Sequence, residues 1–133
     1  MNTLQILDPF QKTLHRLKLE MLYKCNMLKE VRHDLILKAL GDYRRRKILD
    51  LIRDRPRTTG ELCSHFKNLD RCTVMQHLSV LERADLIIVK RKGSYRWNYI
   101  NPLPIKEIYD RWICNYSAKT VDLLARLKQE IEK

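Results

Sequence analysis

The sequence predicts a mainly α-helical fold of the α+β kind, in which short helices lead into one β-hairpin and a long helix stands at each end. Apolar residues recur at helical spacing in two long segments near the chain ends. A β-branched run at 86–89 and an aromatic-rich run at 95–100 flank a turn that contains Gly93. A chain of 133 residues is the size of a single domain.

The first long helix is expected to begin at Pro9, with Asp8 as its cap, and to end at Gly41. Its apolar residues follow the spacing of a coiled-coil seam: Phe10, Leu14, Leu17, Met21, Leu28, Val31 and Leu35. The same spacing allows a break just before Asp34, which would then cap a second helix over 35–40.

Three shorter helices are expected next. The first covers 42–54 and is closed by Pro56; the second covers 60–66, after a turn and helix cap at 57–59. The third covers 71–83 with Asp70 as its cap. Its helical spacing predicts a buried stripe of three residues: Val74, Leu78 and Leu81.

The hairpin is expected to have strands at 86–89 and 95–100, joined by a basic turn at 90–94. Prolines then break the chain, and helical spacing returns in one last helix over 105–131. Short helices followed by a basic-tipped hairpin are typical of a winged helix-turn-helix with a two-stranded wing. We therefore divide the chain into a helical extension at 1–33, a winged helix-turn-helix at 34–101 and a C-terminal helical segment at 102–133.

The charge balance favours a polyanionic partner or an acidic surface, because 27 Lys and Arg against 16 Asp and Glu give a net charge of +11. A basic surface with no partner is the alternative. No apolar run approaches the ~18 residues of a membrane span, and the first residues lack the features of a secretory signal. We therefore expect a cytoplasmic protein without membrane contact, whose four separated cysteines are free thiols.

A helix-turn-helix places the outer face of its second helix in the DNA major groove. If 71–83 is that helix, five side chains point outward: Arg71, Cys72, Met75, Gln76 and Ser79. Arg can bind guanine, Gln can bind adenine, and Cys or Met can contact the thymine methyl. Thr73 and Ser79 are expected on phosphates. A merely solvated face is the alternative, although such faces usually carry more Glu and Lys.

The hairpin tip is expected to lie along the minor groove or backbone, where Arg and Lys neutralise phosphates. Its candidates are Arg91, Lys92, Ser94 and Arg96. A charged strand edge that discourages pairing is the alternative, and both can hold. The basic run at 44–47 could touch phosphate or be a solvated helix face.

Four blocks in order resemble the ArsR/SmtB-type winged-helix transcriptional regulators of bacteria and archaea. They are Leu37–Leu49 (similar to "KALGDPTRRKIL"), Thr59–Cys63 ("TVGEL"), Leu69–Leu81 ("LSRPTVSKHLRVL") and Val89–Pro102 (the wing with "YxLNP"). The resemblance covers about 34–101. Met75 stands where the family has a small Ser, so base contacts cannot be carried over, and Asp85 replaces the usual Gly after the recognition helix.

The resemblance implies a homodimeric repressor that binds double-stranded DNA at a palindromic operator and pairs through its terminal helices. The apolar stripes of those helices are too long for so small a domain to cover, although they could instead pack on each other within one chain. The expected interface residues are Leu14, Leu17, Met21, Leu28, Trp112, Tyr116, Leu123 and Leu127.

Metal-sensing relatives carry paired cysteines where this chain has Cys63 and His65. Residues two apart on a helix point to opposite sides, so these two are weak metal ligands, and we expect no metal or cofactor. Motifs of enzyme active sites are absent from the sequence, which excludes the common catalytic classes. A winged-helix module that binds protein or RNA without operator specificity is the alternative. The sequence identifies no inducer.

Overall fold

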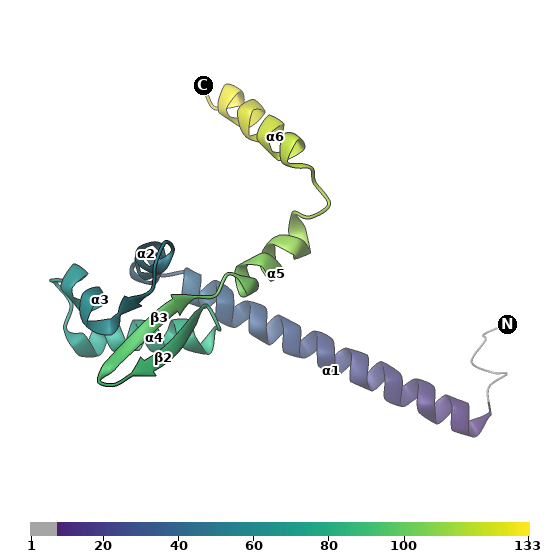
Figure 1. The fold of residues 1–133 in the computed structure, drawn as a ribbon. Helices are drawn as coiled ribbons and strands as arrows, with labels where there is room; N and C mark the ends of the chain where they lie inside the picture. Colours follow the sequence, from purple (N-terminus) through teal and green to yellow (C-terminus); the bar gives the residue numbers. More distant parts are fainter. Residues whose placement is uncertain (1–7) are drawn as a thin grey trace.

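The protein is described by a computed structural model covering residues 8–133, in which six helices and three strands follow one another along the chain (Figure 1). They are α1 (Pro9–Leu40), α2 (Tyr43–Ile52), β1 (Arg57–Thr58), α3 (Thr59–His65), α4 (Arg71–Arg83), β2 (Ile87–Lys92), β3 (Tyr95–Ile100), α5 (Leu103–Trp112) and α6 (Ala118–Ile131). This order confirms the winged helix-turn-helix expected from the sequence.

The hydrophobic core lies where the end of α1, α2, α3, α4 and the hairpin meet. The stripe predicted on α4 is confirmed, because Val74, Leu78 and Leu81 are fully buried. Other buried apolar residues come from each of the surrounding elements: Ile36, Ala39, Ile48, Leu49, Ile52, Leu62, Ala84, Leu86 and Ile87. One face of each short helix is thereby buried, and the opposite face of α4 is exposed to solvent.

The sheet has three antiparallel strands in the order β1-β3-β2, so the expectation of a two-stranded wing missed β1. Residues 57 and 58 pair with Asn98 and Trp97 of β3, although the sequence indicated only a turn and a helix cap there. The basic turn expected at 90–94 is also wrong. Strand β2 continues to Lys92, which pairs with Tyr95, and only two residues form the turn. Gly93 occupies a positive φ of 60° in it, as tight hairpin turns require.

Helix α1 runs unbroken from Pro9 to Leu40, so the break allowed before Asp34 does not occur. After Pro9 at its first position, the helix contains neither Gly nor Pro to interrupt the helical hydrogen bonds. Arg32 lies 3.2 Å from Glu107 of α5, which ties this part of α1 to the domain. Gly41 ends the helix as predicted, whereas the Asp8 side chain makes no capping hydrogen bond.

The single C-terminal helix expected over 105–131 is wrong, because the chain forms α5 and α6 with a turn between them. The Cys114 thiol donates to the carbonyl of Asp110 at the end of α5. Ser117 then caps α6, accepting a hydrogen bond from the backbone N–H of Thr120 at 3.2 Å. A serine placed to cap a helix competes with helix continuation, and this local signal lay inside an otherwise regular apolar spacing.

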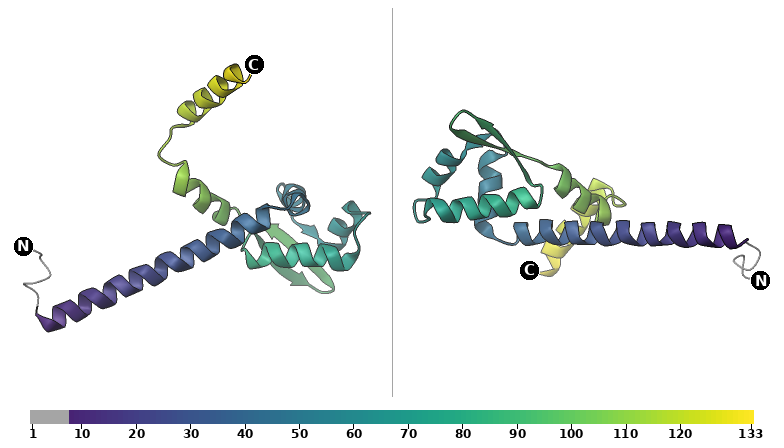
Figure 2. Two further views of the ribbon diagram at one scale, coloured as in Figure 1. Left: turned by 180° about the vertical axis from the view of Figure 1, so that it is seen from behind. Right: turned by 90° about the horizontal axis from the view of Figure 1, so that it is seen from below.

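Two parts of the chain project from the packed unit (Figures 1 and 2): residues 9–31 of α1, called here the projecting half of α1, and α6. Every residue of both is exposed. The two therefore do not cover each other within one chain. No helix formed by residues 8–133 combines the length and the apolar character needed to cross a membrane.

Candidate nucleic-acid interface

Helix α4 presents the polar face that the sequence predicted for base contact. The carboxylate of Asp70 accepts a hydrogen bond from the backbone N–H of Thr73 at 2.7 Å, and this bond lowers the pKa of Asp70. The cap fixes where the helix begins and thereby which side chains point outward. Four of them are exposed, namely Arg71, Cys72, Gln76 and Ser79, whereas Thr73 and Met75 are half-buried.

The wing is joined to α4 through Arg96. Its guanidinium lies 3.0 Å from the Glu82 carboxylate and 4.0 Å from the Met75 sulfur, and the Arg96 side chain is only 16% exposed. Of the predicted wing residues, Arg96 is thus held within the chain and positions the wing, whereas Arg91, Lys92 and Ser94 are exposed.

A hollow of about 330 Å³ separates the start of α4 from the wing. Arg71 and Met75 line it from α4, and Arg91 and Ser94 line it from the wing. Gly60 of α3 also borders it. With Arg96, which also lines the hollow, the structure brings five predicted interface residues from two distant segments to one concave, cationic surface.

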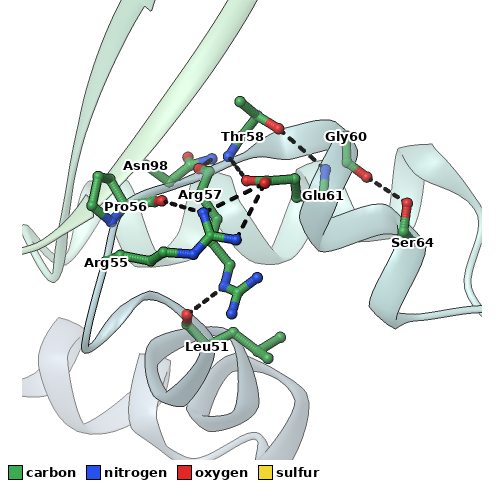
Figure 3. Close-up of polar contacts among 9 residues, drawn as sticks. All are labelled: Leu51, Arg55, Pro56, Arg57, Thr58, Gly60, Glu61, Ser64 and Asn98. Atoms are coloured by element: carbon green, nitrogen blue, oxygen red, sulfur yellow. Dashed lines mark hydrogen bonds and ion pairs between the residues drawn. The ribbon is translucent and has the colours of Figure 1, made fainter.

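Helix α3 supports α4 and is anchored at its first turn (Figure 3). The Thr58 hydroxyl accepts from the N–H of Glu61, while the Glu61 carboxylate accepts from the N–H of Thr58 at 2.9 Å. That second bond, together with the nearby charge of Arg55, lowers the pKa of Glu61. Asn98 of β3 donates to the Arg57 carbonyl, which joins the wing to the same turn.

The basic run at 44–47 divides into two kinds of residue. Arg45 donates to the carbonyls of Ala39 and Lys38, and Arg46 donates to the carbonyl of Leu40. Both thus donate to carbonyl groups in the last turn of α1, where the helix runs out of backbone donors, and the Lys38 carbonyl also accepts from the N–H of Gly41. Arg44 lies over the ring of the adjacent tyrosine at 5.2 Å and has no ion pair within residues 8–133. The sequence could not separate these roles, because they depend on where α1 ends.

His77 lies on the inner edge of α4 and not on its exposed face. Burial lowers the pKa of its imidazole, with Asp42 partly opposing that shift. Its Nδ1 atom is 3.5 Å from the Arg45 guanidinium, and its Nε2 atom is buried without a hydrogen-bond partner among residues 8–133. Burial thus favours the neutral form of the imidazole, and the His77 side chain serves the packing of α4 against α2.

The weak metal candidates do not come together with further ligands. Cys63 is half-buried and His65 is exposed. Within the described residues, no three His, Cys, Asp or Glu side chains are grouped closely enough to hold a metal ion. The four cysteines are free thiols, as expected from their spacing.

The predicted interface residues of the terminal helices are all exposed. Leu14, Leu17, Met21 and Leu28 lie on the projecting half of α1. Trp112 is the last residue of α5, Tyr116 lies in the turn, and Leu123 and Leu127 lie on α6. Nothing in the single chain covers them.

Comparison with known proteins agrees with this geometry. A model of a helix-turn-helix domain matches residues 40–90. The chain is 32% identical over 84 residues to the transcriptional repressor SdpR of Bacillus subtilis, covering 63% of this chain and 91% of that protein. It is 40% identical over 86 residues to the uncharacterized HTH-type regulator YuzN of the same organism, covering 60% and 94%.

Solved structures share the fold. The ArsR family transcriptional regulator RHA00566 superposes with a TM-score of 0.56 at 23% identity, covering 78% of this chain and 94% of that one. A homodimeric winged helix-turn-helix DNA-binding domain from Mycobacterium bovis gives 0.53 at 21%, covering 80% and 88%. The fold and site define a winged helix-turn-helix regulator that binds DNA. This chain belongs to the ArsR family of transcriptional regulators.

Proposed function

We propose that this regulator is a homodimeric repressor that recognises a palindromic operator in double-stranded DNA and acts in the cytosol. The observation that carries the proposal is the outward face of α4, where Arg71, Cys72 and Gln76 stand exposed beside a cationic wing. Arg and Gln make bidentate contacts to guanine and adenine in the major groove. The similarity to SdpR, itself named a repressor, supports the direction of regulation.

The side chains of the site divide by exposure into two roles. Arg71, Cys72 and Gln76 read bases, and the half-buried Met75 contributes apolar contact through its outer edge. Backbone contacts come from five others: Thr73, Ser79, Arg91, Lys92 and Ser94. Phosphate contacts carry little sequence information but set the position of the helix in the groove. Arg96 acts through the wing, because Glu82 already engages its guanidinium.

The dimer is supported by a heptad pattern along α1, most of it on the projecting half. Seam positions recur at alternating steps of four and three residues: Phe10, Leu14, Leu17, Met21, Lys24, Leu28, Val31 and Leu35. Seven of these eight residues are apolar, and all seven are exposed in the single chain. Such a seam buries its side chains against another helix. A second copy would supply one, and two-fold symmetry would then place two α4 helices about one DNA turn, ~34 Å, or a multiple of it apart.

The test is a fluorescence-anisotropy titration of the purified protein against duplexes tiling the DNA upstream of its own coding region. Scrambled duplexes of the same composition are the control, across a salt series. We expect one near-palindromic fragment to bind at least about a thousandfold more tightly than scrambled DNA. Equal, steeply salt-dependent binding to every duplex would contradict operator recognition. Absence of binding at low salt would contradict a DNA-binding role and favour a protein or RNA partner.

A further inference from the structure

We propose that a second hollow, at the opposite end of α3 from the wing, binds a backbone phosphate of the same DNA. The inference rests on the proposed function and adds contacts outside α4 and the wing. The hollow has a volume of about 470 Å³. It is lined by the start of α2 and by the turn between α3 and α4: Tyr43, Arg44, His65, Phe66, Lys67, Asn68 and Leu69.

The lining is cationic and contains no carboxylate. Arg44 and Lys67 supply a guanidinium and an ammonium group, and Tyr43, His65 and Asn68 add hydrogen-bonding groups. Within residues 8–133 neither Arg44 nor Lys67 has an acidic group within 4.0 Å. The two cations therefore gain by meeting an anion from outside the chain.

The neighbouring carboxylates are already engaged as helix caps. Asp42 accepts from the N–H of Arg44 at 2.8 Å, and Asp70 accepts from the N–H of Thr73. Burial raises the pKa of Asp42, but this backbone bond and the charge of Arg45 outweigh burial and lower it overall. Both carboxylates point to backbone groups of their own helices and leave the hollow positive.

The position of the hollow matches the spacing of phosphates across a groove. Gly60, near the start of α3, borders the wing-side hollow, whereas His65, the last residue of α3, borders this one. Seven helical residues span about 10 Å, and the major groove is ~12 Å wide. With α4 in the groove, the wing-side hollow meets one phosphate backbone and the second hollow meets the other.

The structure also explains why these two cations and not their neighbours make the contact. Arg45 and Arg46 are committed to carbonyls at the end of α1. Arg44 lies along the Tyr43 ring, which orients its guanidinium beside the hollow. Lys67 lies in the turn directly before α4, so its contact would also fix the entry of that helix.

The experiment uses the full chain and a labelled 30-base-pair duplex of mixed sequence, whose affinity depends on phosphate contacts. The Arg44→Gln/Lys67→Gln variant is compared with Lys12→Gln/Lys119→Gln, which removes the same charge on α1 and α6. We expect the slope of log affinity against log salt concentration to fall by about 0.9 per protomer, because the variant loses one neutralised phosphate. The control slope should stay unchanged. Arg44→Lys should retain its share of the slope.

Equal slopes for the hollow variant and its control would overturn the inference. Circular dichroism and thermal melting verify that each variant is folded. Failure of the proposed function is separable, because the unmodified protein would then bind no duplex or would bind every duplex equally. If it binds and discriminates sequence while the hollow variant keeps its full slope, only the second phosphate contact is wrong.

Discussion

The packed winged-helix unit buries its apolar residues, whereas the projecting helices leave theirs exposed to solvent. Leu62, Leu78 and Leu81 are 0% exposed, whereas Leu28 on the projecting half of α1 is 71% exposed. All of them are leucines at regular helical spacing. The core of one chain is therefore confined to the winged-helix unit, and the apolar residues of the projecting helices remain uncovered in the single chain, as the proposed dimer requires.

The largest effect is expected from breaking the α1 seam. Leu17→Asp removes one buried leucine from each copy of the proposed dimer, and each is worth about 1.5–3 kcal/mol. Since 1.4 kcal/mol corresponds to a factor of ten, the dissociation constant of the dimer should rise by at least a hundredfold. Light scattering coupled to size exclusion measures the mass. Leu22→Asp, equally exposed but off the seam, is the control. If both variants dimerise equally well, the α1 seam does not form the dimer interface.

A core substitution tests the other region. Leu78→Ala deletes a fully buried side chain of α4 and should lower the free energy of unfolding by about 2–5 kcal/mol. Urea denaturation followed by circular dichroism measures it. In the same assay Leu22→Ala should change stability by less than about 0.5 kcal/mol, because its side chain is already half in solvent. Similar losses for both would mean that the projecting half of α1 is covered in solution on that side as well.

Within the packed unit, the two ends of α4 are expected to differ in base recognition. Arg71→Ala should cost about 1–3 kcal/mol on the preferred duplex and relax preference at one base pair. Anisotropy titrations against single-position duplex variants measure this. Arg83→Ala, at the far end of the same helix, is the matched control. An affinity loss of the same size on every sequence would place Arg71 on phosphate.

The smallest effect concerns the first turn of α3. The pKa of Glu61 is lowered by the Thr58 N–H and by Arg55, so its contribution to stability is present above its ordinary value of 4.5. That contribution is lost as the pH falls through the lowered value. Glu61→Gln should cost at most about 1 kcal/mol near pH 7 and flatten the acid side of the stability curve. Thermal melts between pH 2.5 and 7 measure this, and Glu20→Gln on α1 is the control. If the Glu61→Gln variant and the control have identical pH–stability curves, Glu61 does not stabilise the first turn of α3.

Local signals in the sequence determined most of the packed unit. The Asp70 cap and the spacing of Val74, Leu78 and Leu81 predicted both the start and the outward face of α4. Asp85, which stands where the resembled family has a Gly, adopts a φ of 63°, a left-handed conformation that Asp tolerates better than most residues. These features depend on neighbours within a few residues, which a sequence displays directly.

Other features depend on which segments meet in space, and only the tertiary structure decided them. The sequence could not show that β1 pairs with β3, that Arg96 is held by Glu82, or that Arg45 caps the end of α1. Each joins residues whose pairing depends on the packing of separate elements. The turn between α5 and α6 is different, because its Ser117 cap is local but was hidden by regular apolar spacing. The sequence alone thus determined the helices of the packed unit and the outer face of α4. Tertiary packing decided which cations are free, because a charge is available to DNA only where the fold leaves it unpaired.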